Sequence, residues 1–195
     1  DALVVWTQLD ARPVEVGRLE LHEDTWSLGY NPAWLAVEGR FPISRSLPLR
    51  PEPWSGAVVR RWFANLLPEG AARRAVAQRL GISEDNDWAL LVALGGDCAG
   101  ALSLLPPDRA PPDPAQWAYE PLGDADLARI ARRDVVPLLV GERTVRLSLA
   151  GAQDKLPIAM LDGAPHLPLA SAPSTHILKL PSRDFAHLSV NEAFV

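Results

Sequence analysis

A run of small residues, RLSLAGAQDK (146–155), lies between two apolar segments and ends in Lys155. Glycine and alanine let a backbone approach a ligand closely, so that converging N–H groups can hold a phosphate. The same residues also suit an ordinary hairpin turn. Neither GxxxxGK[ST] nor GxGxxG occurs, so the two common nucleotide-binding fingerprints are absent. Turn chemistry alone leaves both interpretations open.

Two charged residues follow this run. If HILKLP (176–181) is a strand, Lys179 shares a face with Ile177 and stands among apolar neighbours. Such a lysine either extends to the surface or meets a fixed anion. Glu192 begins a predicted terminal helix, where the helix dipole favours a carboxylate without any function.

The order of these features is that of the small lobe of a protein kinase. There a glycine-containing hairpin covers the phosphates, and a lysine in a later strand binds them while pairing with a helix glutamate. Three signals that are weak singly therefore favour phosphate binding when they are taken together.

Other catalytic patterns are missing from the sequence. No GxSxG motif surrounds Ser148, and nothing points to a base that would activate Cys98. The histidines lack metal-site spacing, so we predict no metal site in this chain. They are His22, His166, His176 and His187.

The composition limits the classes of protein. With 48% hydrophobic and 22% charged residues in 195, the chain is expected to fold as a globular protein. A net charge of −5 disfavours extended direct contact with nucleic acid. One cysteine permits no intramolecular disulfide, and no apolar run or basic leader indicates a membrane span or secretion, so a cytoplasmic location is predicted. Because the chain begins at Asp1 and ends in an apparent helix start, we expect a piece of a longer protein.

The first half of the sequence is predicted to form a small α+β domain over residues 1–106. Residues 3–30 alternate with period two and predict three short antiparallel strands. Residues 40–53 hold four prolines and predict an extended loop. Helices are predicted from residue 55 to Pro68, over 71–80 and after Asn86 or Asp87, with Gly81 as a C-cap. A strand at ALSLLPP closes the domain.

The second half of the sequence is predicted to form another α+β unit. Residues 107–122 are expected to form a proline-rich connector, and residues 123–195 the second unit. An amphipathic helix is predicted over residues 124–134. Strands are predicted over 144–149, 155–161 and 176–180.

Six segments resemble a known family. RLSLAGAQDK, STHILKLP and VNEAF resemble successive motifs of the HipA family of bacterial serine/threonine kinase toxins. FPISRSLPL, WFANLLPEG and LLVALGGDCAGALSLLP resemble the N-terminal subdomain of the same family. The resemblance spans nearly the whole chain and implies a subdomain of antiparallel strands and helices, followed by a kinase-like N-lobe sheet with a glycine-containing phosphate loop.

The resemblance also implies roles for particular residues. Ser148 corresponds to the autophosphorylated serine of the family, and Glu192 to the helix glutamate that pairs with Lys179. The implied ATP-binding residues are Leu149, Ala150, Gly151, Ala152, Gln153, Asp154, Lys155 and Lys179. Phosphorylation is expected to eject the loop, because phosphoserine brings roughly two negative charges into a site made for another phosphate.

The remaining expectations concern the parent protein. In the family, the carboxylate that orients the acceptor and the magnesium ligands lie in a large C-terminal lobe, so we expect the 195-residue chain alone to be inactive. The resemblance implies ATP and Mg²⁺ as cofactors, a HipB-like helix-turn-helix antitoxin, operator DNA mainly through that antitoxin, and an aminoacyl-tRNA synthetase as a candidate substrate. Two alternatives are a non-catalytic module, which binds the antitoxin or regulates a separate kinase chain, and a pseudokinase.

Overall fold

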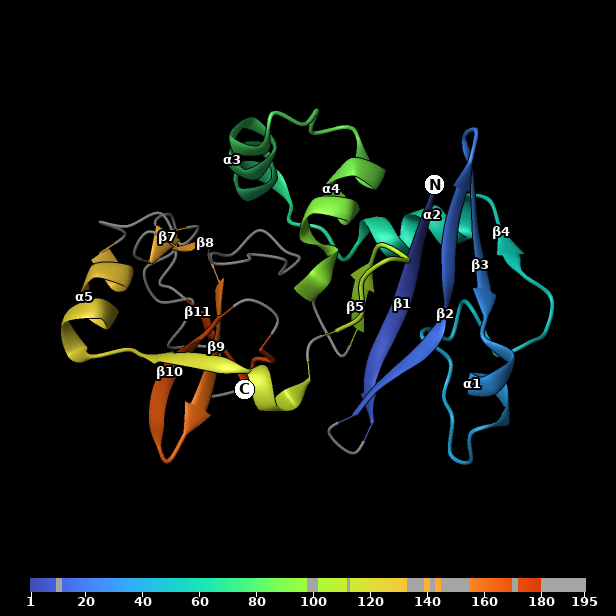
Figure 1. Cartoon of the computed structure of the whole chain (residues 1–195). Helices are drawn as coiled ribbons and strands as arrows, with labels where there is room; N and C mark the ends of the chain where they lie inside the picture. Colours follow the sequence, from blue (N-terminus) through green and yellow to red (C-terminus); the bar gives the residue numbers. More distant parts are fainter. Residues whose placement is uncertain are drawn as a thin grey trace.

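Two antiparallel sheets lie side by side in the computed structural model (Figure 1). The structure describes residues 1–9, 12–97, 102–111, 113–132, 139–140, 143–144, 155–169 and 172–179. The first sheet has the order β4-β3-β2-β1-β5, and the second β11-β9-β10-β6. With five α-helices in the described part of the chain, this confirms the α+β prediction, whereas the predicted phosphate loop lies outside the described residues.

The first unit follows the sequence pattern closely. Its elements are β1 (Ala2–Leu9), β2 (Arg12–His22), β3 (Thr25–Tyr30), α1 (Pro32–Ala36), β4 (Trp54–Ser55), α2 (Ala57–Ala64), α3 (Gly70–Leu80), α4 (Asp87–Leu94), a 3-10 turn (Gly95–Asp97) and β5 (Leu102–Leu105). The three predicted strands are confirmed as β1 to β3, which pair as consecutive antiparallel neighbours. Their alternation of buried and exposed side chains places one face of the sheet against a core.

The ends of two helices lie at the capping residues that the sequence indicates. Gly81 ends α3 in the left-handed conformation with φ 66°, as a C-cap glycine does. The side chain of Asn86 begins α4 by accepting from the backbone N–H of Ala89 at 3.0 Å. Helix α2 ends at Ala64 and not at Pro68, but Leu67 remains buried in the core. Helix α1 was not predicted, although Asn31 and Pro32 are its N-cap and first residue.

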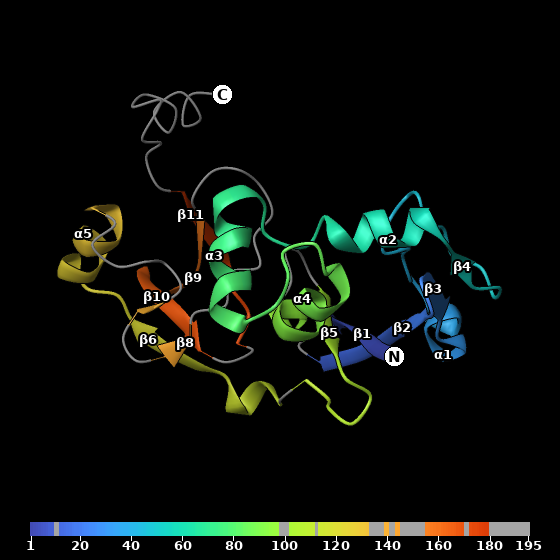
Figure 2. The same ribbon diagram turned by 90° about the horizontal axis from the view of Figure 1, so that it is seen from above.

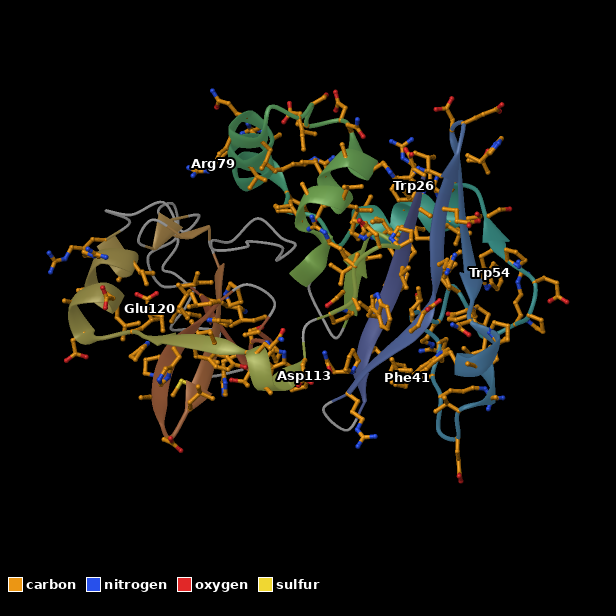
Figure 3. All side chains as sticks on the ribbon, in the orientation of Figure 1. Trp26, Phe41, Trp54, Arg79, Asp113 and Glu120 are labelled. Atoms are coloured by element: carbon orange, nitrogen blue, oxygen red, sulfur yellow. The ribbon has the colours of Figure 1, made fainter. Side chains whose placement is uncertain are left out.

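The core of the first unit lies between the sheet and its helices. Trp34 and Phe63 are fully buried, and Trp26 meets Trp88 edge to face at 5.1 Å between ring centroids. Trp88 is buried in this core, and Trp62 packs against it while staying half-buried. Figure 3 shows Trp26 inside this unit and Trp54 at its outer edge.

The proline-rich segment 40–53 forms a loop without a helix, with a turn from Ser44 to Leu47, and a buried tyrosine fixes it to the sheet. The hydroxyl of Tyr30 donates to the carbonyl oxygen of Leu47 and accepts from the N–H of Ile43 at 3.1 Å. Burial raises the pKa of Tyr30. The hydroxyl therefore stays protonated at neutral pH and can serve both bonds.

One carboxylate connects three helices. Asp87, at the start of α4, accepts from Arg73 of α3 at 2.7 Å and from Arg60 of α2 at 3.0 Å. Arg73 also donates to the carbonyl oxygen of Glu84 at 2.7 Å. The Asp87 side chain is only 13% exposed, so solvent screens these ion pairs less than it screens a surface pair.

The second unit contains three strands, over 118–121, 139–140 and 164–169, that the sequence did not indicate. Its elements are a 3-10 turn (Pro114–Gln116), β6 (Ala118–Pro121), α5 (Asp124–Arg132), β7 (Leu139–Val140), β8 (Arg143–Thr144), β9 (Lys155–Leu161), β10 (Ala164–Leu169) and β11 (His176–Lys179). The strand predicted over 155–161 is confirmed as β9. Strand β10 was not predicted, and β6 lies in the segment predicted to be a connector. Of the strand predicted over 144–149, only Thr144 is described, and it pairs within β7–β8.

Proline decides where β9 and β10 separate. Their pairing joins Leu161, Met160 and Ala159 to Ala164, Pro165 and His166. The next pair would be Ile158 with Leu167, and the pair after that Pro157 with Pro168. Because neither residue has an N–H group to donate, the ladder cannot continue there. Strand β10 then continues along β6 on its other edge, up to Leu169 opposite Ala118.

The second core is small. Helix α5 lays its apolar stripe on one face of the second sheet, with Ile130 buried and Leu127 half-buried. The buried members of this cluster are Leu122, Ile130, Leu156, Ile158 and Leu167. Seen from above, α3 lies on the side of the first unit nearest the second sheet (Figure 2).

Replacing Gly17 tests the close approach of β2 and β3. A Cβ at Gly17 would overlap the carbonyl oxygen of Gly29, whereas a Cβ at Gly29 would meet nothing within 4 Å. We expect Gly17→Ala to lower the free energy of unfolding by about 2 kcal/mol, because backbone atoms must move. The matched variant Gly29→Ala should change it by less than about 0.5 kcal/mol. Equal losses in urea denaturation would contradict this geometry.

Removing the Asp87 carboxylate tests the connection between the helices. Asp87→Asn should cost about 1 to 2 kcal/mol of unfolding free energy, since it leaves the largely buried Arg73 without its charged acceptor. Asp85→Asn, at an exposed site in the same loop, is the control and should be nearly neutral. The two variants are compared by chemical denaturation; similar midpoints would show that the network does not hold the helices.

Candidate functional site

Strand β9 forms the centre of the candidate site. Leu156 and Ile158 point into the small core, and Ala159 is also fully buried. Strands β10 and β11 pair with opposite edges of β9. A strand that is buried and paired in this way is a rigid base for the residues at its ends.

The register of β11 brings two predicted site residues together. Lys179 pairs with Lys155, and Leu178 with Leu156. Residues 151–154 directly precede Lys155 in the chain. Lys179 therefore lies beside the point where the AGAQDK segment joins β9. The sequence pattern alone could not show this pairing, because it joins residues of two distant motifs.

The faces of β11 agree with the predicted alternation. Leu178 packs against the small core, whereas Ile177 is 52% exposed and Lys179 is exposed on the opposite face. Lys179 is thus exposed among the described residues, and its contact with a fixed anion stays a prediction.

The other predicted site residues cannot be placed. Ser148, Leu149, Ala150, Gly151, Ala152, Gln153, Asp154 and Glu192 lie outside the described residues. Their roles remain predictions, as does the ion pair between Lys179 and Glu192.

Two hydroxyl groups near the site were not singled out by the sequence. Tyr119 of β6 donates to the carbonyl oxygen of Pro173 at 3.2 Å, and burial raises the pKa of this tyrosine. Thr175 accepts from the N–H of Met160 at 2.9 Å. Thr175 belongs to the STHILKLP motif, but its bond could not be predicted without the pairing of β11 with β9.

The rest of the described chain offers little other chemistry. No group of three or more His, Cys, Asp or Glu side chains there is arranged to hold a metal ion. An open hollow of about 390 Å³ lies over β2 and β3, beside Glu15, Arg18 and Glu20. Its lining contains no histidine, cysteine or lysine. None of the helices that are described is long and apolar enough to cross a membrane.

Comparison with known proteins agrees with this organisation. Residues 7–105 match the family model described as HipA N-terminal domain. This range covers the end of β1 and all elements from β2 to β5, so the match rests on the first unit.

Relatives extend the likeness into the second unit. The Sinorhizobium fredii protein named "Putative kinase Y4mE" is 46% identical over 99% of this chain and 46% of its own length. The "Serine/threonine-protein kinase toxin HipA" of Shewanella oneidensis is 29% identical over 87% of this chain and 37% of its own. The chain thus spans less than half the length of these relatives.

A solved structure has a similar fold. It is the Shewanella oneidensis toxin–antitoxin complex of HipA, HipB and operator DNA, matched with a TM-score of 0.67 and 27% identity. The match covers 97% of this chain and 42% of the other.

Truncating the two apolar residues of β11 tests its register. Leu178→Ala should lower the free energy of unfolding by about 1 to 2 kcal/mol, less than a fully buried leucine would, because Leu178 is half-buried. Ile177→Ala should stay within about 0.5 kcal/mol, because that side chain is exposed. A larger loss at Ile177 in thermal or urea unfolding would show that the register is wrong.

Proposed function

The chain belongs to the family of the HipA N-terminal domain, and from this premise we propose that it is the front part of a HipA-type serine/threonine protein kinase toxin. The relatives support this proposal, since one is named a kinase toxin and another a putative kinase. Because those relatives are more than twice as long, the catalytic activity is proposed for a longer parent protein and not for these residues alone.

One structural observation carries the proposal. The β9–β11 register sets Lys179 opposite Lys155, at the end of the small-residue segment. A kinase needs a strand lysine close to the loop that covers the phosphates, because phosphoryl transfer is catalysed mainly by positioning and charge. This pairing supports such an arrangement, because it joins two motifs that are distant in sequence.

ATP and Mg²⁺ are the proposed cofactors of the parent protein. Lys179 would attract the phosphates of ATP, and the backbone of residues 149–155 would cover them. Bound ATP supplies the phosphoryl group that is transferred. The described part of the chain lacks a carboxylate cluster that could hold Mg²⁺, so its ligands would have to come from elsewhere in the parent protein.

Control by Ser148 follows from the same charge argument. A phosphate on Ser148 would repel the phosphates of ATP, so the loop would leave the site and nucleotide binding would fall. One covalent modification would then switch the kinase off. In this proposal Glu192 would hold Lys179 in place in the active state.

The partners are proposed from the structural relative. That complex contains HipA with HipB and operator DNA. We propose a HipB-like antitoxin for this protein, with operator DNA bound mainly through the antitoxin, which agrees with a net charge of −5 on this chain. An aminoacyl-tRNA synthetase in the cytoplasm is the proposed substrate class.

The intact mass of the full-length natural protein, measured before and after incubation with Mg²⁺ and ATP, tests the function. We expect a gain of one phosphate that maps to Ser148. Ser148→Ala should abolish the gain and keep ATP binding, whereas Ser148→Asp should weaken ATP binding through charge repulsion. No gain, together with no binding of ATP, would favour the antitoxin-binding module or the pseudokinase. Unchanged affinity in Ser148→Asp would refute the ejection of the loop.

A further inference from the structure

The side chains of β11 specify its register weakly. The strand consists of four residues, HILK, with two adjacent apolar side chains at its centre. A slip of one residue would bury Ile177 in place of Leu178 and turn Lys179 to the opposite face. Isoleucine and leucine gain similar free energy on burial, so apolar burial distinguishes the two registers poorly. The slip would also turn Lys179 toward the core face, which disfavours it, and hydrogen bonds at the start of the strand can add to this specification.

Hydrogen bonds of Thr175 add to this specification. The backbone N–H of Thr175 donates to the carbonyl oxygen of Ile158 at 2.9 Å. Its Oγ1 accepts from the N–H of Met160 at 2.9 Å. Ile158 and Met160 are two residues apart and direct their backbone groups toward the same neighbouring strand. The threonine side chain therefore extends the β9–β11 ladder by one bond beyond the last residue pair of the strand.

Further contacts fix the segment that carries Thr175. The N–H of Ala172 donates to the carbonyl oxygen of Leu169 at 3.0 Å, and Ala172 is 2% exposed. The hydroxyl of Tyr119 donates to the carbonyl oxygen of Pro173. Oγ1 of Thr175 lies 2.8 Å from Nδ1 of His176, within hydrogen-bonding distance. Because the segment is held on both sides, Thr175 can act on β11 from a fixed position.

We propose that Thr175 is a positioning residue, whose hydroxyl fixes the register of β11 and thereby aims Lys179 at the bound anion. The register part stands on the hydrogen bonds alone. The part that concerns the anion rests on the proposed function, in which Lys179 binds the phosphates of ATP. Thr175 itself makes no contact with the nucleotide in this proposal.

Hydrogen exchange of the full-length protein tests the register without nucleotide. Thr175→Val keeps the shape and removes the acceptor, so exchange over 176–179 should become faster, whereas Thr175→Ser should restore the slow rate. Ile177→Thr makes the pattern of β11 unambiguous, since only Leu178 is then apolar at the centre of the strand. In that background Thr175→Val should speed exchange much less. Equal exchange in wild type and Thr175→Val would overturn the register proposal.

Titration with magnesium-ATP tests whether the register serves Lys179. Thr175→Val should weaken the affinity roughly tenfold, as the loss of one hydrogen bond permits, and Thr175→Ser should recover most of it. In a Lys179→Ala background the same substitution should have no further effect, because it acts through the lysine. A protein that was merely less stable would bind with unchanged affinity per folded molecule. Unchanged affinity in Thr175→Val, or an undiminished loss in the Lys179→Ala background, would overturn the positioning role.

The two measurements separate the two proposals. If the wild type binds no ATP, the proposed function fails, and the exchange data alone decide the role of Thr175 in the register. If the wild type binds ATP and Thr175→Val changes neither exchange nor affinity, the proposed function survives and the role of Thr175 is refuted.

Discussion

The pairing of β9 is the constraint on which the second unit depends. Its two edges hold β10 and β11, and through β10 the sheet reaches β6. Its side chains Leu156 and Ile158 form the middle of the small core beneath α5. Because β9 contributes to the core and pairs with the strand that carries Lys179, its register connects the geometry of the core to that lysine.

The two units differ in how much packing supports them. The first contains a large core with several tryptophans and a carboxylate that joins three helices. The second has few buried apolar residues, and its last described strand presents three exposed side chains out of four. Elements with so little apolar burial open more readily than a packed core. Hydrogen bonds from Thr175 and Tyr119 therefore matter more here than equivalent bonds would in the first unit.

This difference suits the function that we propose. Phosphoryl transfer depends on where charges are held, and a kinase that is regulated by a movable loop needs that loop beside a fixed cation. A sheet that is anchored at β9 and lightly packed at β11 can combine both requirements. The family match covers the first unit, whereas the proposed chemistry lies in the second.

By itself the sequence determined the elements whose signals are local. The alternation over 3–30, the C-cap Gly81 and the N-cap Asn86 each depend on neighbouring residues, and the structure confirms them. Strands β6 and β10 escaped prediction because their prolines resemble those of a connector, and only a partner strand makes them part of a sheet. The sequence also singled out Lys155 and Lys179, but not that they pair. Tertiary structure decided that pairing, because a register is chosen by hydrogen bonds between segments that are distant in the chain.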